Sequence, residues 1–184
     1  MWKGFNRFYR RNLKSEAGLL FFSKNINQIP TLRKVGLNCV PHSFSGTKGT
    51  LLTLSALQLI SNKKSLLVSS RKSTILTKVR KGQPIGSRLV FTSEALWQFF
   101  NSLTNFVIPQ LDLIQLFRHQ KKSSDFKFFI KSPMSFAKLG SFFYSFQFLP
   151  PIQVTFTFKK ISNRNKFFFL RLLKLPVSLS EKSR

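Results

Sequence analysis

The chain has 184 residues, and its 31 Lys and Arg against 5 Asp and Glu give a formal net charge of +26 at pH 7. Repulsion on that scale destabilises a compact monomer unless counter-charge is near, and nucleic acid or an anionic membrane surface usually supplies it. Apolar residues make up 42% of the chain, which is enough for a core, so a wholly disordered tail is not expected.

The acidic residues are few and unevenly placed. Residues 17–93, a stretch of 77, contain twelve Lys or Arg and no acid. The chain has no apolar run near the length of about 18 residues that a membrane-spanning helix needs, so no membrane span is expected. The five acids are Glu16, Glu94, Asp112, Asp125 and Glu181.

Composition also bears on the cellular compartment. The single cysteine, Cys39, excludes an internal disulfide and argues against a secreted scaffold. Phe and Lys, at 23 and 20 residues, have A/T-rich codons, as an organellar genome would favour. The basic, aromatic segment 1–14 is typical either of a mitochondrial presequence or of a basic arm that lies along RNA.

Hydrophobic periodicity predicts four elements in the first part of the chain. A first helix ends in the apolar patch 17–23, and alternation over 34–40 predicts a half-buried strand. Residues 41–50 are rich in Ser, Gly and Thr and predict a loop. Apolar residues at helical spacing predict a helix over 51–60, and a second strand follows over 66–70.

A basic loop separates this part from a strand and a helix. Residues 71–82 contain five cations, and a strand resumes over 85–92. Ser93 predicts the N-cap of the next helix, with Glu94 in its first turn, where the helix dipole favours a carboxylate. Pro109 stops this helix.

The last part combines one irregular segment with a clear strand. Residues 118–135 are polar, basic and irregular, apart from the aromatic cluster 126–130, whereas 152–159 alternate strictly. A last helix covers 163–175 before Pro176. Together the elements predict an α+β fold: an antiparallel sheet with helices packed on one face and an open basic RNA-binding face.

The residue patterns of catalysis are missing. His42 and His119 lie in predicted loops without a nearby carboxylate, and Cys39 lies among aliphatic residues, as a core thiol does. One Cys and two His do not make a structural zinc site, and Gly46–Gly49 lacks the spacing of a phosphate-binding loop. We therefore expect no enzyme, no metal and no cofactor.

Two motifs in the middle of the chain are Ser70-Arg71-Lys72-Ser73 and Arg80-Lys81-Gly82-Gln83-Pro84-Ile85-Gly86. They resemble large-subunit ribosomal protein five of bacteria and organelles. The pattern of that family there is a strand, [AS]-[RK]-K-S, a basic loop and R-x-G-x-P-I-G. Segments 28–38, 96–109 and 152–176 resemble the first strand, the M-W-E-F-F helix and the C-terminal end of the family in the same order.

The chain also departs from the family pattern. The family has an R-G-E-R turn where this chain has Phe91-Thr92-Ser93-Glu94. The glycine-rich segment is shortened to about 121–128, and the F-P-E-I element is not recognised, so family roles are not transferred to 118–147. Asn163-Arg164-Asn165-Lys166 replaces the acidic first turn of the last helix.

The resemblance implies a structural constituent of the large ribosomal subunit in the central protuberance. Its partners would be 5S rRNA or an equivalent large-subunit rRNA, the P-site tRNA, small-subunit ribosomal protein thirteen and neighbouring protuberance proteins. The implied rRNA contacts are Arg33, Lys34, Asn38, Lys63, Lys64 and Arg88. The implied tRNA-facing loop residues are Arg71, Lys72, Ser73, Lys78, Arg80, Lys81 and Gln83.

The expected domain organisation is a basic N-terminal arm or helix (1–24), a single ribosomal-protein domain (25–178) and a C-terminal tail (179–184). The expected location is the mitochondrial matrix, on the ribosome, with a plastid or a bacterial cytoplasm as alternatives. Alternative functions are an assembly factor that shares the ribosomal fold and a basic protein on a membrane surface. A membrane-surface protein would place its cations along one helix face, whereas here they gather in loops and on strand faces.

Overall fold

The computed structural model describes residues 2–22, 25, 29–41, 46–73, 75, 79–111, 125–159 and 165–175. The chain forms two compact units, each of which is described by itself. Unit 1 consists of residues 1–35, 91–128 and 155–184, and unit 2 consists of residues 36–90 and 129–154.

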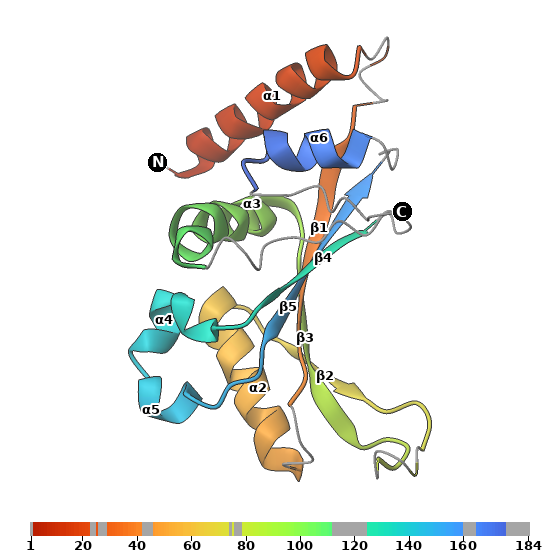
Figure 1. The fold of residues 1–184 in the computed structure, drawn as a ribbon, viewed down its shortest axis with the longest axis vertical. Helices are drawn as coiled ribbons and strands as arrows, with labels where there is room; N and C mark the ends of the chain where they lie inside the picture. Colours follow the sequence, from red (N-terminus) through yellow and green to blue (C-terminus); the bar gives the residue numbers. More distant parts are fainter. Residues whose placement is uncertain are drawn as a thin grey trace, which may run out of the picture. The chain divides into compact units, whose positions relative to one another are not determined.

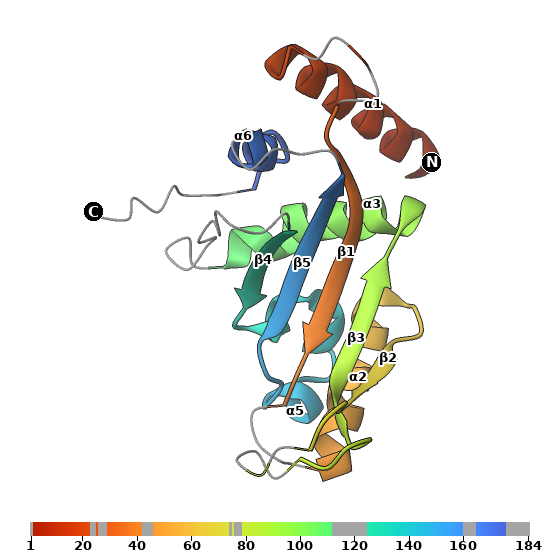
Figure 2. The ribbon, with the colours of Figure 1, turned by 90° about the vertical axis from the view of Figure 1, so that its right-hand side faces the viewer.

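Five strands form one sheet in the order β2-β3-β1-β5-β4, and neighbouring strands run antiparallel (Figure 2). Buried and more exposed residues alternate along most of β3, β4 and β5, as period-two side-chain placement requires. The predicted α+β class and antiparallel sheet are confirmed. The strands are β1 (Thr31–Cys39), β2 (Leu66–Ser69), β3 (Pro84–Phe91), β4 (Asp125–Ile130) and β5 (Ile152–Lys159).

Unit 1 has a core built from aromatic rings. Its helices are α1 (Trp2–Leu20), α3 (Ser93–Ser102) and α6 (Asn165–Leu172), and α1 contacts both others. The ring of Phe156 on β5 lies 5.9 Å from that of Phe100 and 5.7 Å from that of Phe128. Edge-to-face and tilted ring pairs of this kind fill a core efficiently.

The helix α3 ends in an irregular way. It continues into a π-helical turn over Leu103–Val107 and a short 3-10 turn over Ile108–Gln110. The hydroxyl of Thr104 donates to the carbonyl of Phe100 at 3.0 Å, and Pro109 supplies no backbone donor. The prediction that Pro109 stops this helix is wrong, because the α-helix ends at Ser102 and Pro109 lies inside the 3-10 turn.

Unit 2 places its helices on one face of its strands, as Figure 1 shows. These helices are α2 (Gly46–Ser61), α4 (Ala137–Gly140) and α5 (Phe143–Phe146), and α4 contacts both α2 and α5. The Lys138 ammonium on α4 donates to the carbonyl of Ile60 at 3.2 Å and to the Asn62 side-chain oxygen at 3.0 Å. A cation therefore caps the C-terminal end of α2, where the carbonyls have no helical partner.

The helix α2 begins inside the segment 41–50 that was predicted as a loop, so that prediction is wrong over 46–50, whereas 42–45 lie outside the described residues. Thr50 and Thr53 are buried, and their hydroxyls donate to the carbonyls three residues earlier at 2.9 Å. Hydroxyl groups that are satisfied within the helix allow small polar residues to occupy its buried face. The buried stripe consequently consists of Thr53, Ala56, Leu57 and Ile60 rather than the apolar residues alone.

No strand was predicted for the aromatic cluster 126–130, which was set apart from the irregular segment 118–135. Residues 125–130 form β4, with Phe126, Phe128 and Ile130 buried. The exposed Phe129 hides the alternation in the sequence, because an aromatic residue also occupies the outer face. Residues 118–124 lie outside the described residues.

The start of α3 differs from the prediction at one residue. Thr92, with φ −135° and ψ 162°, is the N-cap, and no side-chain hydrogen bond caps the helix. Ser93 is the first helical residue and has a φ of +54°. Ser93 is therefore not the N-cap, whereas Glu94 lies in the first turn as predicted.

Candidate nucleic-acid interface

The strands β2 and β3 of unit 2 form a hairpin whose connecting segment holds most of the predicted loop residues. We call residues 70–83 the hairpin segment. Leu66 pairs with Arg88 and Val68 with Gly86, and the register shifts between Val68 and Ser69. Two backbone hydrogen bonds of Ser70 join the two ends of the segment. The Ser70 N–H donates to the Gln83 carbonyl, and the Ser70 carbonyl accepts from the Gly82 N–H, both at 2.9 Å.

A tight turn lies at the β3 end of the hairpin segment. The Gln83 N–H donates to the Arg80 carbonyl at 3.2 Å, and Gly82 has a φ of +84°. A positive φ at the third position is what a type II turn requires, and glycine adopts it without steric cost. The Gln83 side-chain oxygen also accepts from the Arg80 N–H at 3.1 Å, so this residue helps to shape the turn.

The hydrogen bonds of Ser70 bring the two basic pairs of the hairpin segment to the same place. Arg71 and Lys72 follow Ser70 directly, and Arg80 and Lys81 precede its partner Gly82. All four cations and Ser73 are exposed. The structure thus gathers the predicted loop residues into one basic cluster, apart from Lys78, which lies outside the described residues.

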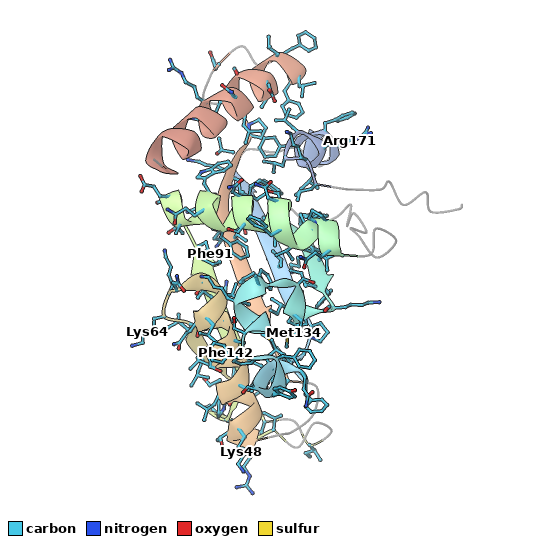
Figure 3. The ribbon with its side chains drawn as sticks, turned by 90° about the vertical axis from the view of Figure 1, so that its left-hand side faces the viewer. Lys48, Lys64, Phe91, Met134, Phe142 and Arg171 are labelled. Carbon is cyan, nitrogen blue, oxygen red and sulfur yellow. The ribbon has the colours of Figure 1, made fainter. Side chains whose placement is uncertain are left out.

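The residues predicted to contact rRNA divide between the two units. In unit 2, Arg88 on β3 is exposed, and the Asn38 amide on β1 donates to the Gln153 side-chain oxygen on β5 at 3.4 Å. Lys63 and Lys64 are exposed in the turn between α2 and β2, and Figure 3 shows Lys64 projecting away from the body. Arg33 and Lys34 belong to unit 1, where Arg33 is exposed and Lys34 half-buried.

Gly86, the last residue of the second motif, has a packing role. A Cβ atom at this position would lie 2.5 Å from the Cys39 carbonyl oxygen and 3.2 Å from the Val40 Cα. These are backbone atoms, which do not move aside as the end of a flexible side chain does. A glycine is therefore needed here for the close approach of β3 and the end of β1.

Unit 2 contains eleven Lys or Arg and no Asp or Glu. Its cations have no carboxylate partner within the unit, so their counter-charge has to come from outside it. Of its cations within the described residues, only Arg88 lies in a strand. The positive charge of unit 2 therefore lies mainly in its connections and helices, and a basic face of the open sheet stays a prediction.

Cys39 is a buried core residue. Its thiol donates to the Pro150 carbonyl at 3.7 Å, and burial raises the pKa of the thiol to about 12. A thiol with that pKa is not a thiolate nucleophile near neutral pH. Within the described ranges, no three His, Cys, Asp or Glu side chains come together as metal ligands. In the same part of the chain, no helix has the length and apolarity to cross a membrane.

The sequence did not single out two features of unit 2 that the structure places on its surface. Lys138 reaches across from α4 to the end of α2, and no local pattern in the sequence indicates that contact. Phe142, Phe143, Tyr144 and Phe148 are exposed around α5. In the sequence they form a run of aromatic residues, and such a run is equally typical of a buried segment.

The fold and the site define a basic α+β protein suited to a polyanionic partner. Relatives from three bacteria are each named large ribosomal subunit protein uL5. The protein of Lawsonia intracellularis is 31% identical over 106 residues, which are 57% of this chain and 59% of the relative. That of Desulfosudis oleivorans is 32% identical over 108 residues, 58% and 60% of the two chains. That of Buchnera aphidicola is 26% identical over 172 residues, 92% and 95% of the two chains.

The chain spans about three fifths of the length of the first two relatives and nearly the whole length of the third. No protein-family model matches it. The predicted resemblance to the large-subunit ribosomal protein five family is nevertheless confirmed by these relatives.

Proposed function

We propose that this protein is a structural constituent of the large ribosomal subunit and binds rRNA there. The observation that supports this most is unit 2, whose eleven cations have no carboxylate within the unit. RNA phosphates supply the missing counter-charge and give an affinity that depends on salt. The names of the relatives support the large subunit as the location and a structural, non-enzymatic role.

Within that role, the proposed rRNA partner is 5S rRNA, or an equivalent large-subunit rRNA, in the central protuberance. Asn38, Lys63, Lys64 and Arg88 of unit 2 would contact it, as would Arg33 and Lys34 of unit 1. Exposed cations on a turn and polar groups on a strand are suited to phosphates and 2′-hydroxyls, through which structured RNA is mainly recognised. The family resemblance supports this assignment.

The hairpin segment is the proposed tRNA-facing element, and it would contact the P-site tRNA. Its two basic pairs flank the hydrogen bonds by which Ser70 joins the two sides of the hairpin, and all four cations are exposed. The further proposed partners are small-subunit ribosomal protein thirteen and neighbouring proteins of the central protuberance. These rest on the family resemblance alone.

The proposed location is the mitochondrial ribosome. The abundance of Phe and Lys, typical of an A+T-biased genome, supports it. The relatives come from bacteria, which keeps a bacterial cytoplasm, besides a plastid, as an alternative. Fractionation of the source cells, with detection of the chain by antibody, would separate these compartments.

Ultraviolet crosslinking in isolated ribosomes, followed by sequencing of the attached RNA, tests the proposed partners. We expect crosslinks to 5S rRNA or to one confined region of the large-subunit rRNA, with additional crosslinks to tRNA. Replacement of Arg71, Lys72, Arg80 and Lys81 should remove the tRNA crosslinks and leave the rRNA crosslinks. Crosslinks confined to messenger or precursor RNA would contradict the proposal.

A further inference from the structure

Four aromatic side chains lie exposed within seven residues of unit 2. Phe142, Phe143, Tyr144 and Phe148 are exposed by 53%, 51%, 89% and 84%. We call these four residues the aromatic segment. The rings of Phe143 and Tyr144 contact each other edge to face, with centroids 6.0 Å apart. Figure 3 shows Phe142 among the side chains of the helical face of unit 2.

The fold holds the aromatic segment in place without burying it. Leu139, Phe146 and Leu149 are buried and anchor the chain before, within and after α5. The remaining residues from 141 to 148 are exposed, and they consist of the aromatic segment, two serines and a glutamine. A surface on which exposed apolar side chains are concentrated in this way is typical of an interaction site, whereas apolar residues that are exposed singly are ordinary.

The charges of unit 2 select the kind of partner. No Asp or Glu occurs in the unit, and the exposed Lys131 and Lys138 precede the aromatic segment in the same connection between β4 and β5. A partner that covers this surface has to be negatively charged and has to present flat apolar faces to the rings. Single-stranded RNA meets both conditions, because its backbone is anionic and its unpaired bases stack on aromatic side chains.

We propose that the aromatic segment binds the unpaired bases of a single-stranded RNA segment. The inference rests on the proposed function for the identity of the polymer, and it adds a second surface with a different chemistry. The hairpin segment offers cations to phosphates, whereas the aromatic segment offers rings to bases. The serines and Gln147 of the same stretch can hydrogen-bond to base edges.

The test compares the full chain with a variant in which Phe143, Tyr144 and Phe148 are all replaced by leucine. Leucine keeps the surface apolar but removes the rings. Each protein is titrated with a labelled short oligouridine, with an abasic oligoribonucleotide of equal length and with a duplex RNA. We expect the leucine variant to lose at least about tenfold in affinity for the oligouridine, which is the scale of stacking on one ring. Its affinities for the abasic strand and the duplex should be unchanged.

Two further variants make the result interpretable. Phe106→Leu removes a ring that is 65% exposed in unit 1 and should leave all three affinities unchanged. Exchange of Phe143 and Phe148 for tyrosine keeps the rings and should retain oligouridine binding. Thermal unfolding of each variant shows whether the fold is intact.

The outcomes separate this inference from the proposed function. Unchanged oligouridine affinity in the leucine variant would overturn the inference, and so would an equal loss for all three ligands, which indicates a structural role. Retained oligouridine affinity in the leucine variant, together with weaker attachment to large subunits when Phe143, Tyr144 and Phe148 are replaced by serine, would overturn the inference in favour of a protein partner. If the wild-type chain binds no RNA of any kind, including large-subunit rRNA, the proposed function itself fails.

Discussion

At the scale of single residues, two groups in the motif region help to build the hairpin. Gly86 permits the close approach of two strands, and the Gln83 side chain accepts a hydrogen bond from the Arg80 N–H. Both belong to the segment that identifies the family. Part of the motif therefore serves to build the hairpin, while its cations are exposed and can reach a partner.

Replacement of Gly86 by alanine should destabilise the protein. The new Cβ would lie 2.5 Å from the Cys39 carbonyl oxygen, so two strands have to shift apart. Forced overpacking of this kind costs about 1–3 kcal/mol in the free energy of unfolding. Urea denaturation monitored by circular dichroism measures the difference.

Gly140→Ala is the matched control for that experiment. Gly140 is the last residue of α4, and a Cβ there meets nothing within 4 Å. The free energy of unfolding should therefore stay the same or rise by up to about 1 kcal/mol, as a compatible Gly→Ala change allows. Equal destabilisation by both substitutions would refute the packing role of Gly86.

The buried Cys39 thiol should be unreactive in the folded protein. Burial raises its pKa from 9.0 to about 12, so the folded state holds a proton that the unfolded state releases above pH 9. The contribution of the thiol to stability is therefore complete below pH 9 and is lost as the pH rises toward 12. Alkylation with iodoacetamide just below pH 9 should be slow in buffer and fast in guanidinium.

The alkylation signal has an unambiguous origin, because Cys39 is the only cysteine of the chain. Cys39→Ser serves as the blank. Rapid labelling of the folded protein, at the rate seen in guanidinium, would show that the thiol is not buried in solution.

At the scale of elements, the sequence predicted the strands and turns that are determined by neighbouring residues, through polar–apolar alternation or through turn-forming residue types. The strand over 152–159 was predicted with its boundaries, and the strands of the hairpin within one residue at each end. The start of α2 was missed because its buried threonines satisfy their hydroxyls within the helix. The strand β4 was missed because Phe129 on its outer face breaks the expected pattern.

The candidate site was predictable in part. The basic residues of the loop were visible as a charge run between motifs, but their grouping depends on the hydrogen bonds of Ser70 across the hairpin. The capping of α2 by Lys138 depends on a contact between elements that lie far apart in sequence. Tertiary contacts of this kind leave no local signal, since the residue types involved also occur on ordinary surfaces.

The hairpin segment should account for a measurable share of the salt dependence of RNA binding. Each cation that neutralises a phosphate adds about 0.7–0.9 to the steepness of the log–log plot of affinity against salt. Joint replacement of Arg71, Lys72, Arg80 and Lys81 by serine should flatten the slope by about three units. Filter binding to tRNA over a range of salt concentrations measures the slope.

A variant that removes two cations elsewhere in unit 2 provides the comparison for the hairpin, charge for charge. Lys131 and Lys48 of unit 2 are exposed and lie outside the hairpin segment, and Figure 3 shows Lys48 at the N-terminal end of α2. Their joint replacement by serine should alter the slope less per charge removed. A slope that is unchanged in the hairpin variant would exclude this segment from the RNA interface.

At the scale of the whole molecule, the distribution of charge is the feature that most constrains function. The net charge of +26 is large, and one compact unit contains no acid at all. A protein with this distribution gains stability from a polyanion that lies against it. A structural protein of the ribosome would be in contact with rRNA permanently, whereas an assembly factor contacts rRNA only during assembly.

Sedimentation of the protein from its source cells tests residence in the large subunit most directly. Lysates are separated on sucrose gradients, and the chain is quantified across free protein, precursor particles, large subunits and translating ribosomes. We predict that it is present in one copy for each mature large subunit, stays bound at moderate salt and accompanies translating ribosomes. Its confinement to precursor particles or to the membrane fraction would contradict the proposed function.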